Sequence, residues 1–176
     1  MSINKLMVSK KNLVLIGMMG AGKSTIGSIL AKKLELEFID IDNIIEEKEG
    51  SAIATIFKKK GESYFRQIEE KISIDLLNSN KKIISLGGGG FVNKNVQKIV
   101  LRDHVSFWLN WKSSTLINRI KNSKKRPLAI SFDIKQLEKL ILDRSQIYIK
   151  AKFNIYCENL NKNEIVNKII NIYEKI

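Results

Sequence analysis

A glycine-rich segment near the amino terminus carries the most specific chemical signal in the chain. Residues 17 to 24 read Gly-Met-Met-Gly-Ala-Gly-Lys-Ser, which fits the pattern G-x-x-x-x-G-K-[ST]. A short apolar run precedes this segment and a stretch with helical apolar spacing follows it, so the loop joins a strand to a helix. Glycines in such a loop let backbone N–H groups face phosphate oxygens, and the start of the helix adds its positive end. The spacing predicts a phosphate-binding loop, against the alternative of a chance match in a glycine-rich turn.

Two side chains at the end of this loop have expected roles in phosphoryl transfer. Lys23 is placed to reach the β- and γ-phosphates of ATP and to stabilise the charge of the transition state. The Ser24 hydroxyl is placed to bind Mg²⁺. The sequence has one histidine and one cysteine, so no Cys/His cluster has the spacing of a metal site, and we expect Mg²⁺ to arrive with ATP.

Two carboxylates follow at the end of the next apolar run. Residues 38 to 42 read Phe-Ile-Asp-Ile-Asp, which puts Asp40 and Asp42 on the same side of an extended segment at the end of a strand. One carboxylate could hold a water of Mg²⁺, and the other could accept a proton from a substrate hydroxyl group. The alternative is that Asp42 only caps a helix that begins near Asn43.

Glycine and arginine are both scarce and unevenly placed. Eight of the ten glycines occupy two stretches, positions 17 to 27 and 87 to 90, where the backbone must approach something closely. The second stretch follows an apolar strand, so its N–H groups could face an anionic substrate, whereas a merely tight turn needs fewer glycines.

Only five of the 31 basic residues are arginine, which favours their use where a planar, permanently charged group is needed. These arginines are Arg66, Arg102, Arg119, Arg126 and Arg144, and surface salt bridges are the alternative for Arg102 and Arg119.

The elements that must position these residues alternate between strands and helices. Strands are expected at 12–16, 37–39, 82–86, 104–109 and 153–156, and helices at 25–34, 43–49, 52–60, 62–78, 93–101, 113–122, 133–150 and 162–176. The strands are too apolar to have one face in water. The pattern therefore predicts an α/β layered fold with a parallel sheet.

Length and composition narrow the class of protein. The chain has 176 residues and an apolar fraction of 44%, which suits one domain with a single core. It has no run of 18 apolar residues and no signal-like segment, so we expect a cytoplasmic protein without a membrane partner. The net charge of +13 raises a nucleic-acid alternative, but the lysines are spread over the whole chain, and we expect no nucleic-acid partner.

At this point the residues resemble the shikimate kinase family. The resemblance extends from Gly17 to Tyr148 and rests on five motifs in the order and at the spacing of that family. The motifs are the phosphate-binding loop extended to Gly27, Phe-Ile-Asp-Ile-Asp at 38–42, Gly-Glu-x-x-Phe-Arg-x-x-Glu-Glu at 61–70, Ser-Leu-Gly-Gly-Gly at 85–89 and Arg-Pro-Leu at 126–128.

The resemblance implies an ATP-dependent transfer of the γ-phosphoryl group to the 3-hydroxyl of shikimate by a monomer. It also implies one domain over 1–176, with a three-layer, five-stranded parallel sheet, a shikimate-binding helical region at about 42–80 and a lid at about 122–132. The ATP-binding residues that it implies are Gly20, Ala21, Gly22, Lys23, Ser24, Thr25, Arg119 and Arg126. The shikimate-binding residues are Asp42, Arg66, Gly87, Gly88, Gly89 and Arg144; the Mg²⁺ residues are Ser24 and Asp40; and the catalytic residues are Lys23, Asp42 and Arg126.

Other functions remain as alternatives. One is another kinase with the same phosphate loop, acting on gluconate or on a nucleoside monophosphate. A different class is a nucleic-acid-binding ATPase, which usually has an apolar strand ending in an acid for Mg²⁺, whereas the strand at 82–86 ends in glycine. Trp111 could border the nucleotide, with packing as the alternative, and His104 is expected to be structural.

Overall fold

The computed structural model describes residues 11–122 and 132–176. Its sheet has five strands in the order β2-β3-β1-β4-β5, and all four pairings are parallel. The strands are β1 (Leu13–Ile16), β2 (Glu37–Asp40), β3 (Lys82–Ser85), β4 (Val105–Asn110) and β5 (Phe153–Tyr156). The helices are α2 (Lys23–Leu34), α3 (Ile41–Glu49), α4 (Ile53–Leu77), η1 (Gly90–Val92), α5 (Lys94–Asp103), α6 (Ser113–Lys121), α8 (Ile134–Tyr148) and α9 (Lys162–Tyr173). The predicted α/β fold and its five-stranded parallel sheet are confirmed.

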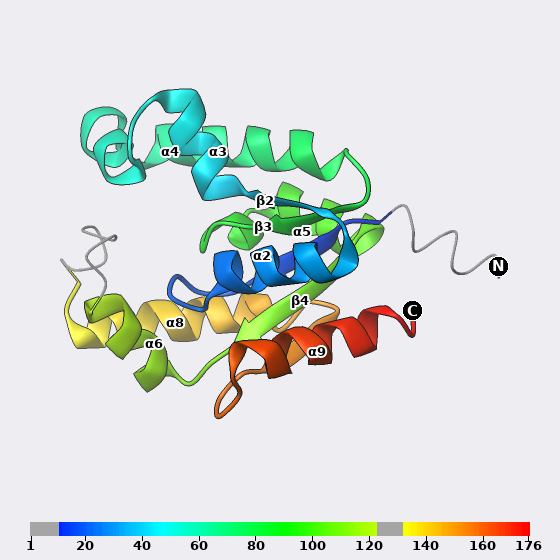
Figure 1. Ribbon diagram of the computed structural model, residues 1–176. Helices are drawn as coiled ribbons and strands as arrows, with labels where there is room; N and C mark the ends of the chain where they lie inside the picture. Colours follow the sequence, from blue (N-terminus) through cyan, green and yellow to red (C-terminus); the bar gives the residue numbers. More distant parts are fainter. Residues whose placement is uncertain (1–10, 123–131) are drawn as a thin grey trace.

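The sheet is the middle of three layers because its central strands have no polar face. All four residues of β1 are buried, as are the first five residues of β4. Such strands need helices on both sides. Figure 1 shows α2 and α9 in front of the sheet and α5 and α8 behind it.

The chain order places the loops after β1 and β3 beside one another. Within the sheet, β2 and β3 lie on one side of β1, and β4 and β5 lie on its other side. Ligands of such sheets bind beyond the carboxyl ends of the strands, at the point where the order reverses. Here that point is the end of β1, where the predicted phosphate loop begins.

Helices α3 and α4 pack against each other and extend beyond the sheet (upper part of Figure 1). Gly61 divides α4 with non-helical angles of φ 83° and ψ 168°, so the break predicted between residues 60 and 62 is present. A left-handed φ of this size costs glycine little and other residues more.

The expected position of the two carboxylates needs one correction. Strand β2 ends at Asp40 and α3 begins at Ile41, so Asp42 lies in a helical turn rather than on an extended segment. Asp40 is the N-cap of α3, because its side chain accepts a hydrogen bond from the Asp42 N–H. The alternative that Asp42 is the cap is therefore wrong.

The predicted lid and Arg126 fall on a segment that the structure does not describe. The lid at about 122–132 lies outside the described residues except for its two end positions, and so does Arg126.

Among the helices of the described ranges, none is both long and apolar enough to cross a membrane.

A buried polar cluster lies at the amino ends of the central strands, opposite the end where the phosphate loop begins. The Asn12 amide group donates to the carbonyls of Leu77 and Ser79 at 3.2 and 2.7 Å and accepts from the Lys82 N–H at 3.0 Å. The Asn12 backbone N–H donates to Nδ1 of His104 at 3.3 Å, so that His104 makes a structural contact. The cluster ties the end of α4 to the starts of the central strands.

Candidate active site

The phosphate loop joins β1 to α2 as the sequence predicts. Gly20 and Gly22 have φ angles of 81° and 86°, in the left-handed region that favours glycine. Lys23 is the first residue of α2, and its Nζ donates to the carbonyls of Gly17 and Met18 at 2.9 and 3.1 Å. The ammonium group therefore lies over the loop where phosphates are expected.

Ser24 and Asp40 meet beside this loop. The Ser24 hydroxyl donates to Oδ2 of Asp40 at 2.5 Å, and Asp40 is 8% exposed. A hydroxyl oxygen and a carboxylate oxygen are the hard ligands that Mg²⁺ takes in nucleotide sites. The pair thus fits the predicted Mg²⁺ role. Within the described residues no group of three or more His, Cys, Asp and Glu side chains could hold a metal by itself.

The glycine-rich turn after β3 is shaped by close contacts rather than by unusual backbone angles. None of the four glycines from Gly87 to Gly90 has a positive φ angle. A Cβ atom added to Gly87 would lie 2.7 Å from Oδ1 of Asp42, and one added to Gly89 would lie 2.3 Å from Nη1 of Arg66. Contacts this short do not occur for real Cβ atoms. The absence of side chains therefore lets charged groups of α3 and α4 reach the turn.

Arg66 is held over this turn by acidic and aromatic neighbours on α4. Its Nη1 donates to Glu69 at 2.7 Å, and its Nε and Nη2 donate to Glu62 at 3.2 and 3.1 Å. The rings of Phe57 and Phe65 lie 5.9 and 5.2 Å from its guanidinium carbon. Burial lowers the pKa of Arg66, but the Glu69 carboxylate and the hydrogen bonds outweigh burial and raise it overall. The guanidinium is fixed in place and remains charged.

Glu69 is a member of this cluster that sequence reasoning missed as a site residue. It is 3% exposed, and a Cβ atom added to Gly87 would lie 2.4 Å from its Oε1. Burial raises the pKa of Glu69, Arg66 opposes that change and Asp42 adds to it. The available signal was its place at the fourth residue after Phe65, within the buried stripe of α4.

Arg144 and Tyr148 hold the other side of the glycine-rich turn. A Cβ atom added to Gly88 would lie 3.1 Å from Nη1 of Arg144 and 3.3 Å from the backbone nitrogen of Met19 in the phosphate loop. The Tyr148 hydroxyl donates to the Gly88 carbonyl, and burial raises the pKa of Tyr148 to about 12. Tyr148 therefore stays protonated and fixes the turn, a role that sequence reasoning also missed.

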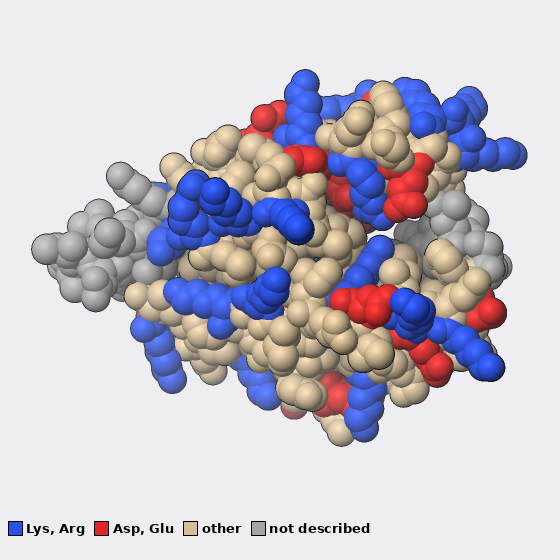
Figure 2. Space-filling view, turned by 180° about the vertical axis from the view of Figure 1, so that it is seen from behind, with Lys and Arg blue, Asp and Glu red and all other residues tan. Residues whose placement is uncertain are grey.

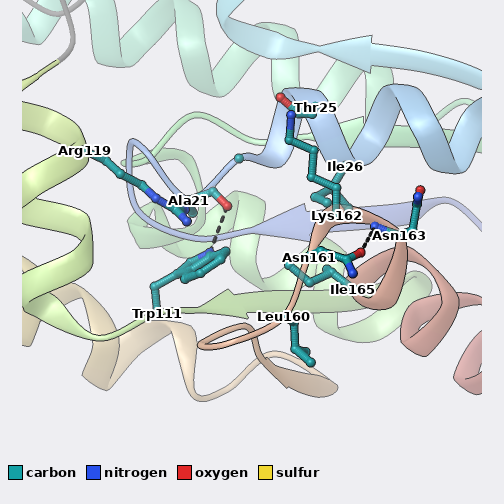
Figure 3. A pocket seen from close by; sticks show the side chains of 11 residues that line it. Ala21, Thr25, Ile26, Trp111, Arg119, Leu160, Asn161, Lys162, Asn163 and Ile165 are labelled. Carbon is teal, nitrogen blue, oxygen red and sulfur yellow. Dashed lines mark hydrogen bonds between the residues drawn. The ribbon is translucent and has the colours of Figure 1, made fainter.

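A cavity of about 710 Å³ opens on the far side of the phosphate loop. Its lining includes the predicted ATP-binding residues Ala21, Gly22, Thr25 and Arg119, together with Trp111 (Figure 3). The structure thus brings Arg119 and Trp111 beside the loop.

The two groups of predicted residues lie next to each other, as adjacent halves of the candidate site. The ATP-side residues gather around the loop after β1, and the substrate-side residues Asp42, Arg66 and Arg144 surround the turn after β3. Gly88 lies between the halves, because a Cβ atom added to it would meet Arg144 at 3.1 Å and Met19 at 3.3 Å. One half suits a phosphate chain, and the other offers two guanidinium groups to a smaller anion.

Comparisons with known proteins agree with this arrangement. A family model described as shikimate kinase matches residues 19–174. The curated shikimate kinase of a Sulfurihydrogenibium species is 39% identical over 160 residues, which cover 91% of this chain and 96% of the relative. The structure of an Acinetobacter baumannii shikimate kinase in complex with shikimate has a TM-score of 0.89 at 28% identity and covers 97% of each chain.

A structure from one of the alternative kinase classes is also similar, but only in fold. A gluconokinase from Sinorhizobium meliloti has a TM-score of 0.57 at 15% identity, covering 95% of this chain and 93% of that one. Identity this low carries the layered architecture and nothing more specific. Both the sequence and the structural likeness therefore favour the first family over gluconate kinases.

Proposed function

This chain belongs to the shikimate kinase family, and we propose that it transfers the γ-phosphoryl group of ATP to the 3-hydroxyl group of shikimate. The observation that carries the proposal is the contact between the two halves of the site. A Cβ atom added to Gly88 would lie 3.3 Å from the Met19 nitrogen and 3.1 Å from Nη1 of Arg144, so an anion bound by Arg144 would lie close to a phosphate chain bound by the loop. Transfer needs this proximity of acceptor and donor.

In the substrate half, Arg66 and Arg144 would bind the carboxylate of shikimate. Both guanidinium groups border the glycine-rich turn, and a planar fork matches a carboxylate with two hydrogen bonds. Within the described part of the chain, three of the five Arg66 N–H groups donate to Glu62 and Glu69, and the other two would bind the ligand. The N–H groups of Gly87, Gly88 and Gly89 in this turn would donate to the same ligand.

Asp42 would act on the hydroxyl that is phosphorylated. Its carboxylate reaches the glycine-rich turn from the first turn of α3. In the transfer, the shikimate oxygen bonds to the γ-phosphorus, the bond from that phosphorus to the β–γ bridging oxygen breaks, and ADP leaves. The hydroxyl proton passes to the Asp42 carboxylate.

Charge that develops on the transferred group would be stabilised by cations of the phosphate half. Lys23 lies over the loop, and Arg126, outside the described residues, is proposed to add a second cation. Mg²⁺ would be held by Ser24 and Asp40, and when bound with ATP it neutralises phosphate charge.

We also propose that the protein acts as a monomer in the cytoplasm, as one domain and without nucleic acid. The described residues proposed for both halves all come from one chain. On the face in Figure 2, Lys and Arg side chains are spread over the whole surface, and Asp and Glu side chains lie among them in the middle and right-hand parts. On that face the positive charge is dispersed, whereas a nucleic-acid footprint is expected to gather Lys and Arg in one patch or stripe.

An acceptor panel tests the function. The purified protein with ATP and Mg²⁺ would be given shikimate, gluconate or AMP, and ADP release would be measured by a coupled assay. We expect a rate with shikimate at least about 100-fold above the other two, and loss of that rate in Lys23→Ala. A rate with gluconate or AMP that equals the shikimate rate would contradict the proposal.

A further inference from the structure

The cavity beside the phosphate loop has an aromatic wall that the transfer chemistry does not require. Trp111 follows β4, and Arg119 comes from α6, on the opposite side of the loop from the substrate half. The guanidinium carbon of Arg119 lies 3.7 Å from the centroid of the Trp111 ring, the shortest cation–π contact in the described part of the chain. Figure 3 shows Arg119 extending over the indole toward Ala21.

Trp111 and Arg119 each bind one carbonyl of the phosphate loop. The indole Nε1 of Trp111 donates to the Ala21 carbonyl at 3.0 Å (dashed in Figure 3), and Nη1 of Arg119 donates to the Gly20 carbonyl at 3.3 Å. The C=O and N–H of a trans peptide point in opposite directions. The bond to Ala21 therefore fixes the direction of the Gly22 N–H, one of the groups expected at the phosphates.

The same contact fixes the plane of Arg119. One face of the guanidinium lies against Trp111, while Arg119 lines the cavity and is exposed. Planar guanidinium groups stack on aromatic rings, and bases stack on such planes without regard to their identity. An arginine held in this way offers a ready surface to a nucleotide base, whereas a mobile one would lose side-chain freedom on binding.

We propose that Trp111 is a positioning residue of the nucleotide site, which holds Arg119 as the wall for the base and anchors the phosphate loop through Ala21. The inference rests on the proposed function only in that a nucleotide binds here. It concerns nucleotide affinity and is independent of the acceptor.

Two substitutions separate the contacts of Trp111. Trp111→Phe keeps an aromatic face for Arg119 but removes the N–H donor, and Trp111→Leu removes both. We expect the dissociation constant for ATP, measured by calorimetry without an acceptor, to rise about threefold in Trp111→Phe and about 10-fold or more in Trp111→Leu. Tripolyphosphate has no base, so its affinity should fall about threefold in both variants.

Steady-state kinetics and fluorescence supply the remaining readouts. Trp111→Leu should raise the KM for ATP and leave the KM for shikimate within twofold. The chain has two tryptophans, so an ADP-induced change in emission should persist in Trp108→Phe, which alters a buried strand residue, and disappear in Trp111→Phe. If Trp111→Leu does not fold, Trp111→Phe tests the inference alone, because it should weaken the binding of ATP and of tripolyphosphate by the same factor.

The inference is overturned if both variants bind ATP within twofold of the wild type, or if the KM values for ATP and shikimate rise together. A wild-type protein that binds ATP but does not phosphorylate shikimate would instead contradict the proposed function, and the nucleotide titrations would still decide the role of Trp111.

Discussion

Asp40 and Asp42 are two residues apart, yet their carboxylates contact different parts of the candidate site. Asp40 caps α3 and receives the Ser24 hydroxyl, so its carboxylate is engaged on the nucleotide side. Asp42 points to Gly87, on the substrate side. The junction of β2 and α3 between them directs one carboxylate to each half of the site.

Replacement of Asp42 by asparagine tests its proposed role as the base. Asn keeps the size of the side chain but cannot accept the proton, so turnover should fall about 100-fold or more while the melting temperature stays unchanged. Asp40→Asn is the matched control: asparagine is also a good N-cap, so it should instead weaken the dependence on Mg²⁺. A folded Asp42→Asn protein with full turnover would remove the base assignment.

At the scale of elements, the glycine-rich turn gives an internally controlled experiment. A methyl group at Gly89 would meet Arg66 at 2.3 Å, but one at Gly90 would meet its nearest neighbour, Leu86, at an ordinary 3.5 Å. Gly89→Ala should therefore displace Arg66 and raise the KM for shikimate about 10-fold, with little change in the KM for ATP. Gly90→Ala should change both constants less than about threefold. Equal effects of the two substitutions would mean that the turn does not position Arg66.

The elements themselves were largely predictable from the sequence. Apolar runs marked the central strands β1, β3 and β4, because parallel strands buried on both faces need continuous apolar residues. Gly61 marked the break in α4, since its conformation is one that glycine adopts readily. The glycine pattern marked the phosphate loop for the same reason.

The errors arose where burial or an exact boundary decided the outcome. The sequence around Asp42 does not show whether the strand ends at residue 40 or 42, because aspartate suits both a strand end and a helix cap. Glu69 has helical spacing from the buried Phe65, but its charge favours a surface position, and only its packing against Arg66 and the turn makes it part of the site. The contact between Tyr148 and Gly88 joins distant segments and left no local pattern.

At the scale of the whole molecule, the polar cluster around Asn12 makes stability depend on pH. Burial of His104 lowers its pKa below the ordinary value, opposed by Asp103 and the Leu77 carbonyl and assisted by Lys11 and Arg102. Protonation would also displace the hydrogen bond from Asn12 N–H to Nδ1. A group with a lowered folded-state pKa contributes stability above its unfolded pKa, about 6.5 for histidine, and this contribution is lost as the pH falls toward the folded value.

Urea unfolding at about pH 7.5 and about pH 5.5 should reveal this contribution. We expect the free energy of unfolding to fall more in the wild type than in His104→Asn, which keeps an acceptor but does not titrate. Glu69, whose raised pKa acts in the opposite direction, is shared by both proteins and cancels in the difference. Parallel losses in the two proteins would show that His104 does not carry the effect.

The central claim is that both halves of the site act together to move a phosphoryl group from ATP to shikimate. Phosphorus NMR of a mixture of protein, ATP, Mg²⁺ and shikimate follows that group directly. We expect the γ-phosphate signal to be replaced by one phosphomonoester signal of shikimate for each ADP formed, and no conversion with Lys23→Ala. Formation of ADP with inorganic phosphate alone, or conversion that is unchanged in Lys23→Ala, would contradict the claim.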